Sequence, residues 1–343
     1  LLERHLFDEM ARDPDPVEET SGGRLTAPAP PVEPNKVNGI PRDALLLVLS
    51  RLEAHEVVRT CVLSREWCHL WCDVPRINVL RHKWGADADG SYEEGNPPFK
   101  KFVNRLLMLR NPVPLDRFGL WHYIGSQLEA DSADAKLWIA HALLSKARKV
   151  EVFAWGNALE IGPGVFTSHI DDTEISSRTL EILAVIGGSV FTSDGRLSIS
   201  IPSLLYLQLF GQARGRIPLL ENTESLKIAY VSFGWFEGIG IQPHDDFRQF
   251  LRSISGAVNL EFYFVQTELN MEKSLQWCPK FNNLLLLTLG EWCLLADFYA
   301  LIVILQNSPN LYTLTLNRKR VHMLLPNLCT FTFSLYEKFM HVL

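Results

Sequence analysis

The 343 residues of this chain include 47% hydrophobic and 21% charged side chains, and the formal net charge is -6 at pH 7. This composition is typical of a globular protein with room for two domains, and the negative charge argues against general nucleic-acid binding. No apolar run approaches the roughly 18 to 20 residues that span a bilayer, and the amino terminus lacks a signal-peptide pattern. We therefore expect a protein of the cytoplasm or nucleus that binds neither nucleic acid nor membrane.

Residues 1–37 are rich in Pro, Glu, Asp and Gly. Such a composition cannot bury enough apolar surface to offset the entropy of ordering, so we expect a disordered arm. The chain opens on Leu1 rather than on methionine, which suggests that the sequence is a fragment.

A helix is predicted to start near Pro41, because proline suits the first helical turn and its missing N–H would have no partner there. Leu45, Leu49 and Leu52 then fall at i, i+4 and i+7 and form one apolar stripe. The residues between them are also apolar, so this helix needs burial on more than one side.

Two further helical segments are predicted after this stripe, a longer one from about His55 and a short one that carries Trp71. About thirty residues cannot enclose this much apolar surface alone, because units this small usually need outside support. A pair of ordinary core helices packed on the rest of the chain is the alternative. Binding to a partner protein would also bury the apolar surface that these helices leave exposed.

The order of these residues resembles an F-box: Ile40-Pro41, the spaced leucines, Val62-Leu63-Ser64, then Trp67 and Trp71. The resemblance implies an F-box over residues 38–80 that docks a Skp-type linker protein and, through it, a cullin. The residues it assigns to linker binding are Ile40, Pro41, Leu45, Leu49, Leu52, Val58, Val62, Leu63, Trp67 and Trp71. Glu66 and Cys68 depart from the family's usual basic residues.

Residues 81–98 contain several Gly, Asp and Pro residues and are predicted to be a loop or linker. Helical periodicity resumes at Phe99, where we place the start of a domain that runs over residues 99–343.

From Val150 onward, a spacing of apolar, two positions, apolar, one position, apolar recurs. The clear copies are Val150-Phe153-Trp155, Leu180-Leu183-Val185, Leu204-Leu207-Leu209, Leu284-Leu287-Leu289 and Leu311-Leu314-Leu316, and the weaker ones are Leu226-Ile228, Leu260-Phe262 and Leu328-Phe331-Phe333. This spacing resembles a leucine-rich repeat, in which one face of each short strand enters a shared core. Gly187-Gly188 is interpreted as a turn between repeats.

Residues 134–147, 245–255 and 297–306 each begin with an acidic residue and continue with helix-period apolar residues. We expect these helices on the outer face of an irregular α/β solenoid with parallel strands. A compact alternating α/β domain is the alternative. An F-box followed by such repeats resembles the plant F-box/leucine-rich-repeat family, whose members often end in an FBD domain; the short remainder after Leu316 implies a truncated or divergent terminus.

No catalytic constellation stands out, and we expect no catalytic residues, cofactor or metal. Cys61, Cys68, His69 and Cys72 cluster in sequence, but zinc sites normally use two short Cys/His pairs held apart by a loop. The cysteines lack a Cys-x-x-Cys pair, which favours reduced thiols.

The resemblance thus implies a non-catalytic adaptor of a Skp-cullin-F-box ubiquitin ligase, in which the repeats bind a protein substrate. A repeat-based scaffold with a decayed F-box is the alternative. Parallel strands expose one side chain between each buried pair. The residues predicted to read the substrate on that exposed face are Tyr206, Gln208, Lys227, Tyr263 and Tyr312, with the three tyrosines on one side.

Overall fold

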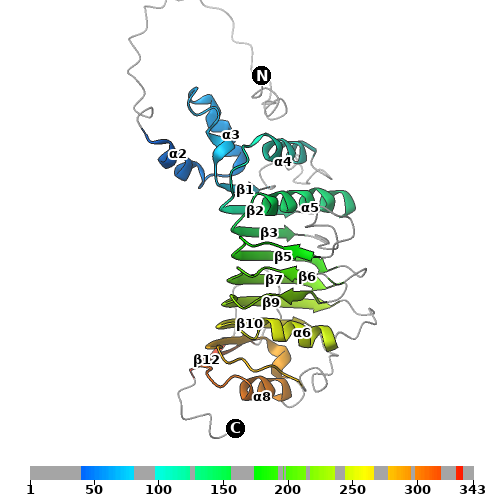
Figure 1. Cartoon of the computed structure of the whole chain (residues 1–343). Coiled ribbons are helices and arrows are strands. Elements are labelled where there is room, and N and C mark those ends of the chain that lie inside the picture. The colour runs from blue at the N-terminus through cyan, green and yellow to red at the C-terminus, as the bar shows by residue number, and fades with distance from the viewer. Residues whose placement is uncertain are drawn as a thin grey trace, which may run out of the picture.

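A ten-stranded sheet runs the length of the structure, and its strands lie in chain order (Figure 1). The strands are β1 Arg76–Leu80, β2 Arg117–Tyr123, β3 Lys149–Trp155, β5 Ile182–Phe191, β7 Tyr206–Ala213, β9 Ile228–Trp235, β10 Asn259–Val265, β11 Leu286–Leu289, β12 Thr313–Asn317 and β13 Thr330–Ser334. Each neighbouring pair from β1 to β12 is parallel, as the repeat spacing predicts.

The last pair is different, because β13 runs antiparallel to β12. The expectation of parallel strands is therefore wrong for the weak copy at residues 328–333. An antiparallel neighbour needs only a hairpin connection, whereas a parallel one needs a crossover of a dozen or more residues.

This computed structural model describes part of the chain. The described residues are 40–80, 97–123, 128–155, 174–191, 196, 198–213, 217–235, 244–265, 277–294, 298–317 and 330–334. The predicted disordered arm 1–37 and most of the predicted loop 81–98 lie outside them.

The core consists of two buried ladders that cross the sheet from strand to strand. One ladder joins Ile77, Phe118, Val150, Leu183, Leu207, Ala229, Leu260, Leu287 and Leu314, and the other joins Val79, Leu120, Val152, Val185, Leu209, Val231, Phe262 and Leu289. Leu316 continues the second ladder but is only half-buried. Each strand from β1 to β12 in this sheet has a third buried position, which precedes the first residue of the strand by the same number of residues. These positions are Val74, Leu115, Ala147, Leu180, Leu204, Leu226, Ala257, Leu284 and Leu311.

The repeat therefore begins at Val74, well before the predicted start at Val150. The predicted register of the copy at 150 is also wrong, because Val152 and Ala154 enter the core while Phe153 lies on the other face. Aromatic residues in β3 resembled the apolar positions of the repeat and concealed the smaller residues between them.

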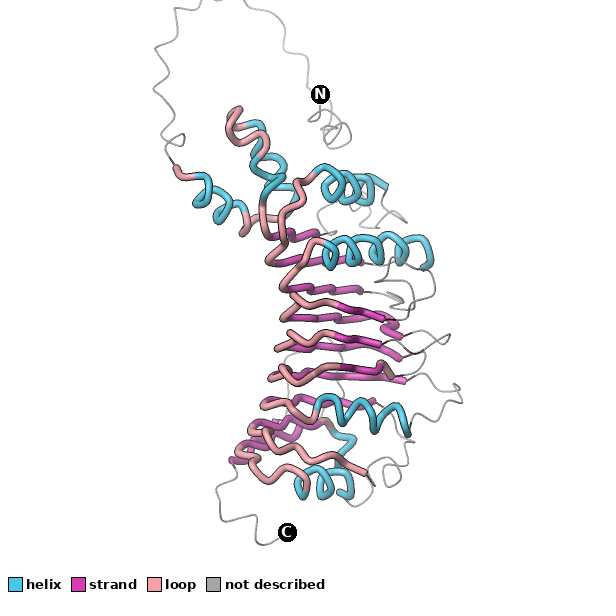
Figure 2. The backbone as a smooth tube through the Cα atoms, in the orientation of Figure 1, coloured by secondary structure: helices cyan, strands magenta, loops and turns pink. Residues whose placement is uncertain are grey.

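Helices and a second sheet cover the core on the side opposite the ten-stranded sheet (Figure 2). The helices are α5 Leu128–Leu144, α6 His244–Ile254 and α8 Tyr299–Gln306, close to the three predicted segments, and the second sheet is formed by the parallel strands β4 Glu174–Ser176, β6 Ser198–Ser200 and β8 Leu219–Glu221. The connections from Leu180 to Leu204 and from Leu204 to Leu226 cover only 24 and 22 residues. In these two repeats the outer segment is a short strand, β6 or β8.

Gly187 lies inside β5 at a φ of 100°, not in a turn between repeats as predicted. Pairing of β5 with β7 shifts register between Ile186 and Ser189, so this glycine permits a bulge within the strand.

A small helical module projects beyond β1 at one end of the sheet (Figure 1). It comprises α2 Arg42–Leu49, α3 Ala54–Arg59 and the 3₁₀ segments η2 Thr60–Val62 and η3 Leu70–Asp73; helix α4 Pro97–Leu109 follows β1. Its buried residues belong to the same continuous core as the sheet. Among the described residues, no helix combines the length and apolarity required to cross a membrane.

Candidate functional site

Helix α2 divides its apolar residues between two sides. Pro41 precedes the helix, and its carbonyl oxygen accepts a backbone hydrogen bond from Leu45 at 3.1 Å. Leu45 and Leu49, one turn apart, are 7% and 0% exposed and face the core. Leu47 and Val48 are each 56% exposed on the other side. This helix therefore keeps an apolar surface in solvent.

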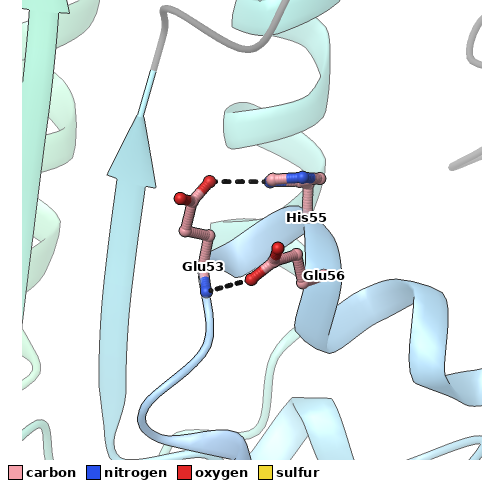
Figure 3. A group of neighbouring side chains, drawn as sticks. All are labelled: Glu53, His55 and Glu56. Atoms are coloured by element: carbon pink, nitrogen blue, oxygen red, sulfur yellow. Dashed lines mark hydrogen bonds and ion pairs between the residues drawn. The ribbon is translucent and has the colours of Figure 1, made fainter.

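Helix α3 is held at its start by a capping box (Figure 3). The backbone N–H of Glu53 donates to Glu56 Oε2 at 3.1 Å, and His55 Nδ1 lies 3.4 Å from Glu53 Oε2. Within the described ranges, these three residues form the one group whose ligand atoms lie close enough for a metal ion. The capping contacts account for their arrangement, and we assign no metal to them.

The segment after α3 exposes two more apolar residues. Val62 ends η2 and is 76% exposed, and Leu63 beside it is 60% exposed. Trp67 is half-buried against the core, while Trp71 in η3 is buried. The two tryptophans therefore anchor this segment, and the pair Val62-Leu63 faces away from it.

The residues predicted to bind the linker separate into three groups. Leu45, Leu49, Val58 and Trp71 are buried, Leu52 and Trp67 are half-buried, and Ile40, Pro41, Val62 and Leu63 are exposed. The buried four can act on a partner only by supporting the fold of the module. Leu47 and Val48 were not among the predicted residues, although their place between Leu45 and Leu49 on a helix indicates the opposite face.

The three cysteines of this module are not joined in disulfides. Cys61 and Cys72 are buried, and Cys68 is half-buried. Burial raises the pKa of the Cys72 thiol, and the neighbouring Asp73 raises it further. His69 is exposed, so the cluster that the sequence places together is divided between the interior and the surface.

Asp73 joins the helical module to the residues that follow α4. It forms an ion pair with Arg42 of α2 and accepts a hydrogen bond from Asn111 Nδ2 at 2.6 Å. Arg110 donates to the carbonyl oxygen of Val74 at 3.3 Å, and burial lowers the pKa of this guanidinium. These contacts tie α2, η3 and the end of α4 together.

A cavity of about 260 Å³ opens between α2 and the first strands of the sheet. Its lining consists of Asp43, Leu46, Leu47, Ser50, Asp73, Pro75, Arg76 and Asp116. The exposed side of α2 is thus continuous with the beginning of the sheet.

The predicted substrate residues lie along the later strands of the sheet. Tyr206 is half-buried, and its hydroxyl donates to Gln208 Oε1 at 2.9 Å across the open face, which is the face opposite the core. Lys227 and Tyr312 are exposed, and each lies one residue before the start of its strand. By alternation they belong to the same side of the strand as core residues such as Leu314, and not to the open face. Of these four residues, only Tyr206 and Gln208 alternate onto the open face.

Tyr263 is buried, which corrects the prediction that it is exposed with Tyr206 and Tyr312. Its hydroxyl donates to Glu261 Oε1 at 2.6 Å and accepts from Asn317 Nδ2 at 2.5 Å. Burial, followed by the hydrogen bond to Glu261, raises the pKa of this tyrosine. Alternation alone could not reveal this network, because Asn317 comes from a strand two positions away in the sheet.

The earlier strands carry a row of apolar side chains that the repeat spacing did not predict. Strand pairing places Leu80, Trp121, Phe153, Ile186 and Phe210 side by side, out of phase with the buried ladders. All five are half-buried. We call this set the aromatic row. A correct register for the copy at 147–152 would have revealed it, because Phe153 then falls on the open face.

Comparison with known proteins matches residues 38–78 to the F-box domain family. An FBD-associated F-box protein from Arabidopsis thaliana is 25% identical over 182 residues, 49% of this chain and 39% of its own length. An F-box/LRR-repeat protein from the same plant is 28% identical over 121 residues, 35% of this chain and 24% of that protein. Another Arabidopsis protein, named for an F-box and LRR repeats, is 25% identical over 312 residues, 82% of this chain and 73% of its own length.

The chain thus spans less than half of the first two relatives. No solved structure matches it. The family match and the relatives confirm the predicted resemblance to plant F-box/leucine-rich-repeat proteins.

Proposed function

We infer that this chain, similar to plant F-box/leucine-rich-repeat proteins over most of its length, is the substrate-recognition adaptor of a Skp-cullin-F-box ubiquitin ligase. The F-box docks the Skp-type linker, the linker joins the cullin, and the repeats bind a protein substrate. The ligase chemistry belongs to other subunits, and the adaptor contributes proximity.

The exposed apolar side of the F-box carries this proposal. Leu47, Val48, Val62 and Leu63 are between 56% and 76% exposed, while the opposite sides of the same helices are buried. A small module that holds four large apolar side chains in water is typical of an interaction site. Full burial of one such side chain contributes about 1.5–3 kcal/mol, so contact with a linker would recover part of that for each residue.

The contacts of Asp73 fit the adaptor role. The ion pair with Arg42 and the hydrogen bond from Asn111 hold α2 against the segment that leads into β2. A linker bound to α2 would therefore have a fixed orientation relative to the first strands of the sheet. Fixed geometry favours transfer between two bound proteins, because it reduces the orientational entropy lost in the reaction.

We further propose that the sheet, its outer helices and the second sheet form an irregular leucine-rich-repeat solenoid. The recurrence of three buried apolar positions at each of β1 to β11 supports it. In such an array each repeat packs on its neighbours, and the open face of the strands becomes a continuous binding surface.

The alternative is a repeat scaffold whose F-box has lost the linker, as Glu66 and Cys68 would suggest. Glu66 is exposed and adds a carboxylate near Val62 and Leu63 in sequence. A surface that binds no linker would leave the exposed apolar residues without a role, so we favour the adaptor.

Titration of the purified chain with a Skp-type linker separates the two functions. Wild type should bind, and Leu63→Asp should weaken binding at least tenfold, about 1.4 kcal/mol, because it places a charge in the apolar contact. Leu144→Asp is the matched control, since Leu144 is 80% exposed on α5, away from the F-box, and its substitution should leave affinity unchanged. Equal affinity of all three proteins would exclude the proposed surface, and a folded wild type that binds no linker would favour the scaffold.

A further inference from the structure

The aromatic row covers five neighbouring strands on the open face of the sheet. Register pairs join Leu80 to Trp121, Trp121 to Phe153, Phe153 to Ile186 and Ile186 to Phe210. With strands about 4.8 Å apart, the row extends about 19 Å across the sheet. Beyond it, the corresponding positions are Ser232 and Tyr263, so the apolar row ends where the buried polar network begins.

These side chains do not serve the core. Among the described residues, none of the five belongs to the buried cluster or to the half-buried residues packed against it. Parallel sheets are ordinarily covered on both faces, whereas the described helices α5, α6 and α8 and the second sheet all lie on one side of this sheet. An apolar row on the face that no described element covers is suited to a partner.

Two of the rings are held in place before any partner binds. Trp121 and Phe153 stack with ring centroids 5.0 Å apart and planes 6° apart. Gly119 provides the space, because a Cβ there would lie 2.5 Å from the Trp121 ring. Rigid aromatic rings lose little entropy on binding, which makes them effective anchors.

The charges beside the row are unbalanced. Arg117 Nη2 lies 2.5 Å and Lys149 Nζ lies 2.9 Å from the carboxylate of Glu151, so two cations share one anion. The Arg117 guanidinium also lies 5.8 Å from the centre of the Trp121 ring. The Arg117 and Lys149 side chains remain 33% and 32% exposed. A positive surplus therefore adjoins the stacked pair Trp121 and Phe153 in the row.

We propose that the aromatic row, together with Arg117 and Lys149, binds a short acidic segment of the substrate protein that also carries large apolar side chains. Its apolar residues contact Trp121, Phe153 and their neighbours, and its carboxylates meet the two cations. This inference rests on the proposed adaptor function and specifies the substrate class. The substrate contact then lies on the earlier strands, and not at the predicted tyrosines.

Selection from a displayed library of random 12-residue peptides on the whole chain tests the inference. We expect a pool enriched in Asp or Glu together with Leu, Phe or Trp. A synthetic peptide from that pool should lose at least tenfold in affinity for Phe153→Ser and for Lys149→Glu, and the second loss should shrink at high salt. Matched controls on the outer side are Leu144→Ser and Arg252→Glu, which should bind within twofold of wild type.

The same proteins are titrated with the Skp-type linker, and their melting temperatures are compared. Phe153→Ser should keep linker binding and a wild-type melting profile, so that a loss of peptide affinity reports the contact. Selected peptides that are basic or purely polar, an empty selection, or equal affinity for Phe153→Ser and wild type would overturn the inference. Failure of the wild type to bind the linker would count against the adaptor instead. Gly119→Ala, which displaces the Trp121 ring without a change of charge, should reproduce the loss.

Discussion

Replacement of Gly187 by alanine should destabilise the sheet. Gly187 has a φ of 100°, and a Cβ at this position would lie 1.9 Å from the carbonyl oxygen of Ala154 in β3. An L-residue that must adopt a left-handed conformation lowers the stability of the fold by about 1–2 kcal/mol. The clash is with backbone, so β3 and β5 must also separate and lose one or two ladder hydrogen bonds, each contributing about 1 kcal/mol. We expect a total loss of about 2–4 kcal/mol in the free energy of unfolding.

Urea unfolding monitored by circular dichroism measures this loss, and Gly256→Ala is the matched control. A Cβ added to Gly256 would meet no atom within 4 Å, and the φ of this residue is not left-handed, so its substitution should change stability by less than about 0.5 kcal/mol. If Gly187→Ala unfolds at the same urea concentration as Gly256→Ala, the assignment of the bulge within β5 is wrong.

The helical module and the core support three more predictions. Leu49→Ala should lower the free energy of unfolding by about 2–5 kcal/mol in a denaturation experiment, because Leu49 is 0% exposed; a loss below about 1 kcal/mol would contradict its burial. Asp73→Asn removes the negative charge that pairs with Arg42, so limited proteolysis should cut the helical module faster than in wild type; an identical digestion pattern would show that this ion pair does not secure α2. Burial raises the pKa of Cys293 to about 12, so the thiol stays protonated and unreactive at pH 8; maleimide should label half-buried Cys68 sooner, and equal rates would refute the assignment.

The sequence was sufficient for the repeat where its apolar residues are leucines. Leu204, Leu207 and Leu209 are buried as the spacing predicts, and the same holds for the copies at Leu180 and Leu284. Alternation on a strand fixes which residues share a face, so a correct register gives the correct core.

The copies that escaped detection are those with smaller or aromatic residues at the key positions. Val74 and Ala147 occupy the first position without being leucines, and the copy that begins at Ala257 was recognised only as the weaker pair Leu260-Phe262. At β3, Phe153 gave a false match three residues out of register. Hydrophobicity alone does not distinguish a buried alanine on the core face of a strand from a half-buried phenylalanine on the open face.

The F-box was found from its motif, and its exposed side was found only in part. The motif includes residues that support the module, such as Leu49, as well as residues that face outward, such as Leu63. A motif records both without separating them. The burial of Tyr263 was also outside the reach of the sequence, because it depends on Asn317, 54 residues away.

Assembly of the chain with a purified Skp-type linker and a cullin, followed by size-exclusion chromatography, tests the adaptor function most directly. We expect one complex that contains all three proteins, and no co-elution of the chain with the cullin when the linker is omitted. Leu63→Asp should elute apart from the linker and cullin, while Leu144→Asp should join them. A folded wild-type chain that elutes alone in the presence of both partners would contradict the adaptor function.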